Sequence, residues 1–153
     1  MSDAPAEIPV PQDVRQLDDM LSTPTPRVLE TLRQLSGDVM ILGVGGKMGP
    51  TLARMVRRAV DASGTPRRVI GVSRFSSSEL PRQLAEWGVE PVACDLLDEE
   101  SVARLPDAPL VISMAGFKFG ASSNPSLTWA MNCYLPAVIC RRFRQSRMAT
   151  FSS

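Results

Sequence analysis

The sequence predicts an α/β fold: a doubly wound parallel sheet of about five strands with helices on both faces. Three observations predict it. From residue 38 onward, short continuous apolar runs alternate with segments of helical periodicity, which is typical of strands buried on both faces. A glycine cluster joins the first apolar run to the first long helical segment. The length of 153 residues suits one such domain.

The N-terminal part of the chain has a different pattern, and we expect a flexible arm followed by a helical extension. Residues 1–13 are rich in proline and polar groups, which favours the arm. Residues 14–37 predict two helices, of which the first covers 14–21. Thr25 can cap the second helix, and Pro26 suits its first position because the missing N–H is not needed there.

The remaining residues predict strands and helices in strict alternation. The predicted strands cover residues 39–44, 68–73, 89–94, 110–114 and 147–151. The predicted helices cover residues 48–63, 79–87, 98–105 and 124–145. At the start of the second of these helices, Ser76 to Ser78 with Glu79 give a capping signal. The first is expected to bury one apolar stripe, formed by Met48, Leu52, Met55, Val56 and Ala59.

Four of the ten glycines fall in the segment GVGGKMG, between the first predicted strand and helix. In such a turn one glycine permits the bend, another admits a pyrophosphate, and a third lets the helix pack on the strand. The N-terminus of the helix that follows favours phosphate binding, because its free N–H groups and positive dipole face the ligand. The alternative is a glycine-rich turn that binds no ligand. A P-loop is excluded, because no Ser or Thr follows the lysine. The predicted binding residues are Gly43, Gly45, Gly46, Lys47, Met48 and Gly49.

Gly43, Gly46 and Gly49 form the motif GxxGxxG, and with it the chain resembles the short-chain dehydrogenase/reductase superfamily. It is most similar to the extended branch of that superfamily, the NAD-dependent epimerase/dehydratase family. The resemblance covers residues 38–153. It implies a Rossmann-type domain that binds a nicotinamide dinucleotide and contributes the cofactor part of an oxidoreductase or epimerase.

Three further positions fit the same resemblance. Asp95 and Leu96 end the third strand, where the family contacts adenine. Ala115 and Gly116 end the fourth strand, near the family's nicotinamide ribose. Asn132 lies at the place of the family's structural and catalytic asparagine. Each position has an alternative: a turn cap for the aspartate, an ordinary strand exit for the Ala–Gly pair, and an exposed helix side for the asparagine.

Pro136 bears on the role of Asn132. It follows four residues later and has no N–H, so it cannot bond the carbonyl of Asn132. In the family that asparagine holds a water of the proton relay, and a free carbonyl suits this role. A helix bend without catalytic function explains the proline equally well.

The end of the second strand predicts which nicotinamide cofactor is preferred. Ser73 and Arg74 stand there, and no carboxylate follows until Glu79. A hydroxyl beside a guanidinium suits a 2′-phosphate, so NADP is favoured over NAD. The alternatives are that Arg74 faces solvent, or that it stacks on adenine whichever cofactor is bound.

The family's Tyr-xxx-Lys pair is missing. The only tyrosine is Tyr134, four residues before a valine, and it precedes the fifth strand, whereas the family's pair follows it. Ser153 is the best match for the family's catalytic serine, so Ser153 and Asn132 are the candidate catalytic residues. We therefore expect no catalysis by this chain alone. It is either a truncated copy of a longer enzyme or a non-catalytic NAD(P)-binding regulatory or partner-binding module.

Composition excludes other functions and suggests partners. The sequence has no histidine, which rules out histidine-based triads and imidazole zinc sites, and its three cysteines form no CxxC pair. The net charge of +1 argues against nucleic acid, and no apolar run nears the ~20 residues that span a bilayer. We expect a cytoplasmic protein, with a homodimer possible through an uncovered last strand. A small-molecule substrate is expected only in a full-length form, and a sugar nucleotide is the family's commonest choice. Lys118 either contacts a phosphate of the substrate or cofactor or is a solvated loop charge.

Overall fold

The computed structural model describes residues 10–117 and 123–150, and it confirms the α/β fold with one parallel sheet. The five strands have the spatial order β3-β2-β1-β4-β5, and every neighbouring pair is parallel. Their bounds are β1 Val39–Leu42, β2 Val69–Ser73, β3 Glu90–Ala93, β4 Leu110–Ser113 and β5 Arg147–Thr150.

The strand order reverses beside β1. The chain builds the sheet outward from β1 to β3, then crosses back to β4 on the other side of β1. In the register, Leu42 at the end of β1 lies beside both Val72 of β2 and Ser113 of β4. The segments that leave β1 and β4 therefore go to opposite faces, which opens a crevice at the carboxyl ends of the strands.

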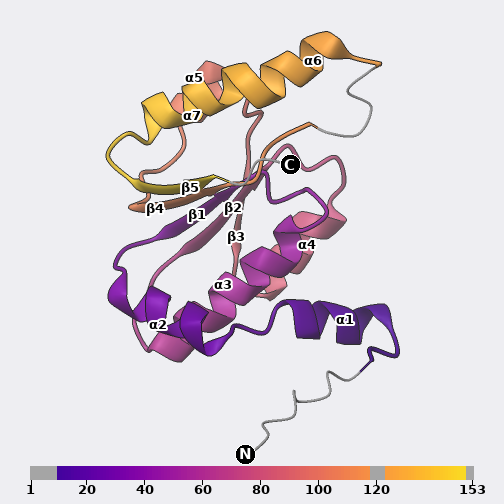
Figure 1. Cartoon of the computed structure of the whole chain (residues 1–153), viewed down its shortest axis with the longest axis vertical. Helices are drawn as coiled ribbons and strands as arrows, with labels where there is room; N and C mark the ends of the chain where they lie inside the picture. Colours follow the sequence, from indigo (N-terminus) through magenta and orange to yellow (C-terminus); the bar gives the residue numbers. More distant parts are fainter. Residues whose placement is uncertain (1–9, 118–122, 151–153) are drawn as a thin grey trace, which may run out of the picture.

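Helices cover both faces of the sheet (Figure 1). α2, α3 and α4 lie on one face, with α1 beside α3, and α5, α6 and α7 lie on the other. The bounds are α1 Val14–Leu21, α2 Pro26–Gln34, α3 Gly49–Ser63, α4 Glu79–Glu86, α5 Glu99–Ala103, α6 Pro125–Trp129 and α7 Leu135–Arg142, with a π-helical segment, η1 Ala130–Tyr134, between the last two. None of the helices in the described ranges is long and apolar enough to cross a membrane.

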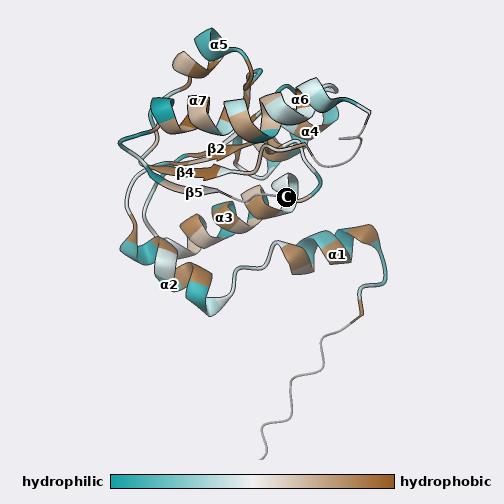
Figure 2. Cartoon of the chain, turned by 45° about the horizontal axis from the view of Figure 1, so that its top comes forward, coloured by the Kyte–Doolittle hydropathy of each residue, from teal (hydrophilic) through white to brown (hydrophobic). Residues whose placement is uncertain are grey.

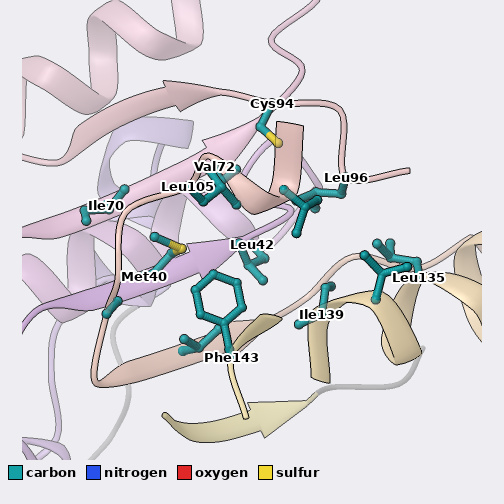
Figure 3. Close-up of a cluster of buried hydrophobic side chains, with 14 residues drawn as sticks. Met40, Leu42, Ile70, Val72, Cys94, Leu96, Leu105, Leu135, Ile139 and Phe143 are labelled. Atoms are coloured by element: carbon teal, nitrogen blue, oxygen red, sulfur yellow. The ribbon is translucent and has the colours of Figure 1, made fainter. Parts of the chain in front are cut away.

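Each face of the sheet has its own hydrophobic cluster. On the α5–α7 face, Figure 3 shows Ile139 and Phe143 pointing toward Met40 and Leu42 of the central strand, and all four side chains are buried. On the other face, α3 packs on β1 and β2 through small residues such as Ala53. The central strand is thus buried on both sides, as its continuous apolar sequence predicts.

The N-terminal helices are packed on the Rossmann-like domain. Leu32 of α2 is buried in the same cluster as α3, and its carbonyl accepts a hydrogen bond from Arg67 Nη2 at 2.7 Å. α1 is attached differently: Asp19 forms ion pairs with Arg54 and Arg58 of α3, both at 2.7 Å. Figure 2 shows hydrophobic and hydrophilic residues alternating along α1, and none of its residues is buried.

Two local expectations need correction. Ser78 does not cap α4, because its backbone is in the right-handed helical region rather than the extended one a cap needs, and its side chain accepts no capping bond. The buried residues of α3 are Gly49, Ala53, Val56, Ala59 and Val60. Of the predicted stripe only Val56 and Ala59 are buried, while Leu52 and Met55 are half-buried and Met48 is 64% exposed.

The long helix after β4 is also interrupted. The N–H of Leu135 donates to the carbonyl of Ala130, five residues back, instead of the usual four. Pro136 has no N–H with which to continue the regular ladder, and the π-helical segment lies directly before α7, which contains this proline. Asn124 caps the start by accepting the N–H of Leu127 at 3.0 Å, and the final helix ends at Arg142 rather than at 145.

Candidate functional site

A cleft of about 420 Å³ lies over the carboxyl ends of the strands. It collects the exits of β1, β2, β3 and β4 and one side of the helix that follows. Its lining residues are Gly43, Gly45, Gly46, Ser73, Arg74, Phe75, Ser76, Ser77, Leu80, Cys94, Asp95, Leu96, Leu97, Met114, Ala115, Gly116, Phe117, Leu127 and Met131.

The exit of β1 is held tightly against its neighbours. The N–H groups of Gly43 and Val44 both donate to the carbonyl of Val72, at 2.9 and 3.0 Å. Gly43 has φ +83°, and a Cβ there would lie 2.8 Å from the backbone nitrogen of Ala115. Only glycine fits this position, because any side chain would collide with the exit of β4.

The other glycines of the motif have distinct surroundings. A Cβ on Gly49 would lie 2.2 Å from the carbonyl oxygen of Val44, so this glycine lets α3 approach the strand. A Cβ on Gly45 would meet Ser73 Oγ at 2.4 Å. A Cβ on Gly46 would contact only the carbonyl oxygen of Gly43, at 3.5 Å, so the protein itself does not require glycine there.

The start of α3 offers unused hydrogen-bond donors. Among the described residues, no hydrogen bond uses the N–H groups of Gly45, Lys47 or Met48. Met48 precedes the helix without a side-chain cap, and the first turn has no acidic residue, so no side chain within residues 10–117 and 123–150 caps this positive helix end. The side chains of Lys47 and Met48 are exposed and do not line the cleft, and neither does Gly49.

The exit of β2 presents a free cation to the cleft. Arg74 is exposed, lines the cleft, and makes no hydrogen bond or ion pair with any residue the structure describes. Phe75 follows with φ +49°, the one non-glycine residue in the described ranges with a positive φ. Its side chain packs against the hydrophobic cluster on the α3 face. The chain thus turns sharply at Phe75, and Ser76 and Ser77 also reach the cleft.

The exit of β3 combines a turn with a cleft wall. Asp95 is exposed and its Oδ1 accepts the N–H of Leu97 at 3.0 Å, so it stabilises the turn while it lines the cleft. Leu96 is buried to 7% exposure and forms an apolar part of the wall. Burial raises the pKa of the Cys94 thiol, and the nearby charges of Asp95 and Asp98 add to the effect. Cys94 therefore stays a protonated, unreactive thiol at neutral pH.

The exit of β4 is fixed by Asn132. The Asn132 Nδ2 donates to the carbonyl of Phe117, and the Phe117 N–H donates to the Asn132 Oδ1, both at 2.8 Å. Ala115, Gly116 and Phe117 line the cleft, whereas Asn132 does not. Asn132 therefore supports this wall from behind, and Met131 beside it contacts the cleft.

The remaining candidates lie elsewhere. Ser153 and Lys118 are outside the described residues. The Tyr134 hydroxyl donates to Glu99 of α5, away from the cleft, and that hydrogen bond raises the tyrosine pKa.

Several lining residues were not predicted. Phe75, Leu80, Met114, Leu127 and Met131 are apolar and read as core or loop residues in the sequence. Their position in the sequence could have indicated them, because Phe75 and Met114 each lie within two residues of the end of a strand, where the cleft forms.

Comparison with known proteins identifies the fold. No protein-family profile matches the chain, and no curated protein matches it. Among solved structures, ribose-5-phosphate isomerase from Brucella melitensis 16M is similar at 18% identity and TM-score 0.58, over 78% of this chain and 52% of that one. Cj0485 dehydrogenase is similar at 13% identity and TM-score 0.55, over 72% and 46%. Pen from Bacillus thuringiensis is similar at 15% identity and TM-score 0.54, over 70% and 34%.

These likenesses show a Rossmann-like α/β fold. At such low identity they show the fold alone. The matched part of this chain spans about half the length of these proteins or less.

Proposed function

We propose that this chain binds a nicotinamide dinucleotide in the cleft, as the cofactor-binding part of an NAD(P)-dependent epimerase/dehydratase or reductase. One observation carries the proposal: Gly46 lines a cleft beside unused N–H groups at the start of α3, and a Cβ there would make only one ordinary contact, with the carbonyl oxygen of Gly43. A glycine that the fold itself does not need is explained by a ligand that approaches the backbone closely. A pyrophosphate is such a ligand, because its oxygens accept hydrogen bonds and its charge suits the helix dipole.

NADP is the preferred cofactor in this proposal. Arg74 has no acidic partner among the described residues, and Ser76 and Ser77 bring two hydroxyls to the same side of the cleft. No carboxylate stands at the end of β2 to bond the ribose hydroxyls and repel a 2′-phosphate. Leu96 gives the adjacent wall an apolar surface on which adenine can pack.

We propose binding without turnover for this chain. Hydride transfer to a carbonyl needs a proton donor or acceptor near the reacting oxygen. Among the described residues, the titratable side chains that line the cleft are Arg74, Cys94 and Asp95, and they lie at the exits of β2 and β3 rather than β4. Tyr134 is engaged with Glu99 outside the cleft. A sugar-nucleotide substrate remains a prediction from the sequence for a full-length form, and a homodimer remains a prediction for this chain.

Calorimetric titration with NADP and NAD tests the binding. We expect measurable affinity for both and tighter binding of NADP. Gly46→Val should weaken binding roughly tenfold or more, which is about 1.4 kcal/mol per tenfold, while the melting temperature changes little. Gly64→Ala is the control: Gly64 ends α3 far from the cleft with φ +68°, so the variant loses stability but keeps its affinity. Equal affinity of wild type and Gly46→Val would refute the proposal.

A turnover assay tests whether this chain catalyses a reaction by itself. The purified chain is incubated with NADP or NAD and a panel of simple carbonyls, alcohols and sugar nucleotides, and absorbance at the reduced-nicotinamide band is followed. We expect binding and no turnover. Sustained turnover would show that this chain uses an acid–base group other than the family's tyrosine–lysine pair.

A further inference from the structure

A second, smaller cleft of about 270 Å³ adjoins the first and has a different chemistry. Six residues line it, five of them Leu or Met; they are Leu21, Met48, Thr51, Leu52, Met55 and Met114. The Thr51 hydroxyl donates to the carbonyl of Met48 at 3.1 Å, so its polar atom is satisfied within α3. None of the described residues that line this cleft is charged, which makes it a surface for apolar groups.

The two clefts meet at the exit of β4. Met114 lines both of them, and its neighbours Ala115 and Gly116 line only the larger one. A molecule bound at this exit can therefore extend past Met114 into the apolar cleft. Methionine side chains adapt their shape to the group they contact, so this boundary can adjust to a ligand.

Helix α1 contributes one residue to the wall of this cleft, and ion pairs attach the helix to α3. Leu21 at its end lines the apolar cleft, while Asp19 pairs with Arg54 and Arg58 of α3. Arg58 also donates to the Asp19 carbonyl at 3.1 Å. The N-terminal extension thus contributes to the shape of the site as well as covering the sheet.

We propose that this apolar cleft binds an alkyl or aryl group of a small-molecule substrate whose polar part lies at the β4 exit. As a statement about a substrate, this rests on the proposed function, because the substrate would sit beside the dinucleotide. The volume is slightly below the ~300 Å³ at which whole-ligand pockets begin, which suits one part of a ligand. A protein partner would cover some 20–30 residues, far more than the six that line this cleft.

Fluorescence titration with the neutral apolar probe N-phenyl-1-naphthylamine tests the cleft. Leu21→Asn and Met55→Gln each place an amide in its wall, and either should weaken probe binding roughly tenfold, because the apolar probe would cover that amide without giving it a hydrogen-bond partner. Leu17→Asn is the matched control, one helical turn earlier on α1 and outside the cleft, and it should change probe affinity less than about twofold. Thermal melts confirm that each variant is folded.

The dinucleotide makes the two proposals separable. With saturating NADP present, the probe should still bind the wild type, and Gly46→Val should leave probe affinity unchanged. Loss of NADP binding with intact, Leu21-dependent probe binding would refute the proposed function and retain the apolar site. The inference is overturned if neither wall variant weakens the probe, if NADP competes with it, or if probe binding falls with rising protein concentration because a second copy covers the cleft.

Discussion

The side-chain amide of Asn132 pairs with the backbone of Phe117 through two hydrogen bonds of 2.8 Å, one donated in each direction. The pairing joins the π-helical segment to the wall of the cleft that follows β4. Asn132 is exposed and contacts the cleft only through Phe117, so we assign it a positioning role. This role needs a side-chain amide, because the group must donate one hydrogen bond and accept another at the same time.

Replacing Asn132 should loosen this wall. Asn132→Ala removes both bonds, and for an exposed pair we expect a loss of about 1 kcal/mol in the free energy of unfolding together with weaker NADP binding. Asn132→Asp keeps the acceptor for the Phe117 N–H but loses the donor, so its affinity should be intermediate. Urea denaturation and calorimetric titration measure the two effects. An alanine variant with unchanged NADP affinity would contradict the positioning role.

The glycines of the loop should separate into packing and binding positions. In Gly49→Ala the new Cβ would overlap the carbonyl of Val44, and we expect a loss of about 1–3 kcal/mol in the free energy of unfolding. Gly46→Ala is the matched variant, because its Cβ has room, and its stability should stay within about 0.5 kcal/mol of wild type. Urea denaturation measures the free energy of unfolding of both variants. Equal values would show that the start of α3 can shift to make room for the Cβ of Gly49→Ala.

Arg74 should set the preference for NADP. Arg74→Ala is expected to reduce NADP affinity roughly tenfold with little change for NAD, since one charge-assisted contact is worth about 1.5–3 kcal/mol before solvent exposure reduces it. Adding Ser73→Asp should turn the preference toward NAD. Arg82→Ala is the control, an exposed arginine of α4 that does not line the cleft. Unchanged ratios of NADP to NAD affinity would mean that Arg74 only faces solvent.

The attachment of α1 should depend on pH. The hydrogen bond from Arg58, with the charges of Arg54 and Arg58, lowers the pKa of Asp19 below its usual value of 3.8. The carboxylate therefore stabilises the folded chain above that value, and its contribution is lost as pH falls through the lower folded-state pKa. At pH 6 the melting temperature of the wild type should be higher than that of Asp19→Asn. This difference should disappear well below pH 3.8.

Asp18→Asn is the control for this prediction. Asp18 lies on the same helix, but its side chain makes no hydrogen bond or ion pair with the described residues. Its melting temperature should follow the wild type at both pH values. A gap between wild type and Asp19→Asn that persists at low pH would show that the ion pairs do not attach α1.

Local sequence signals determined most of the secondary structure. Thr25 and Pro26 fixed the start of α2, and the helix over 14–21 was predicted with its observed bounds. The continuous apolar runs gave the five strands to within two residues, and the glycine cluster marked the exit of β1. Such features follow from sequence because capping, backbone conformation and strand burial depend on neighbouring residues.

Tertiary structure decided the contacts between distant segments. The sequence placed Asn132 near the site, but its pairing with Phe117 depends on how the π-helical segment lies against the exit of β4. The motif assigns its glycines different roles, and only the tertiary surroundings show that a Cβ would have room at Gly46 and would overlap the backbone of Val44 at Gly49. Met48 fits the helical stripe yet faces outward into a cleft with Leu21, because small residues elsewhere on α3 let that helix pack on the sheet through another side.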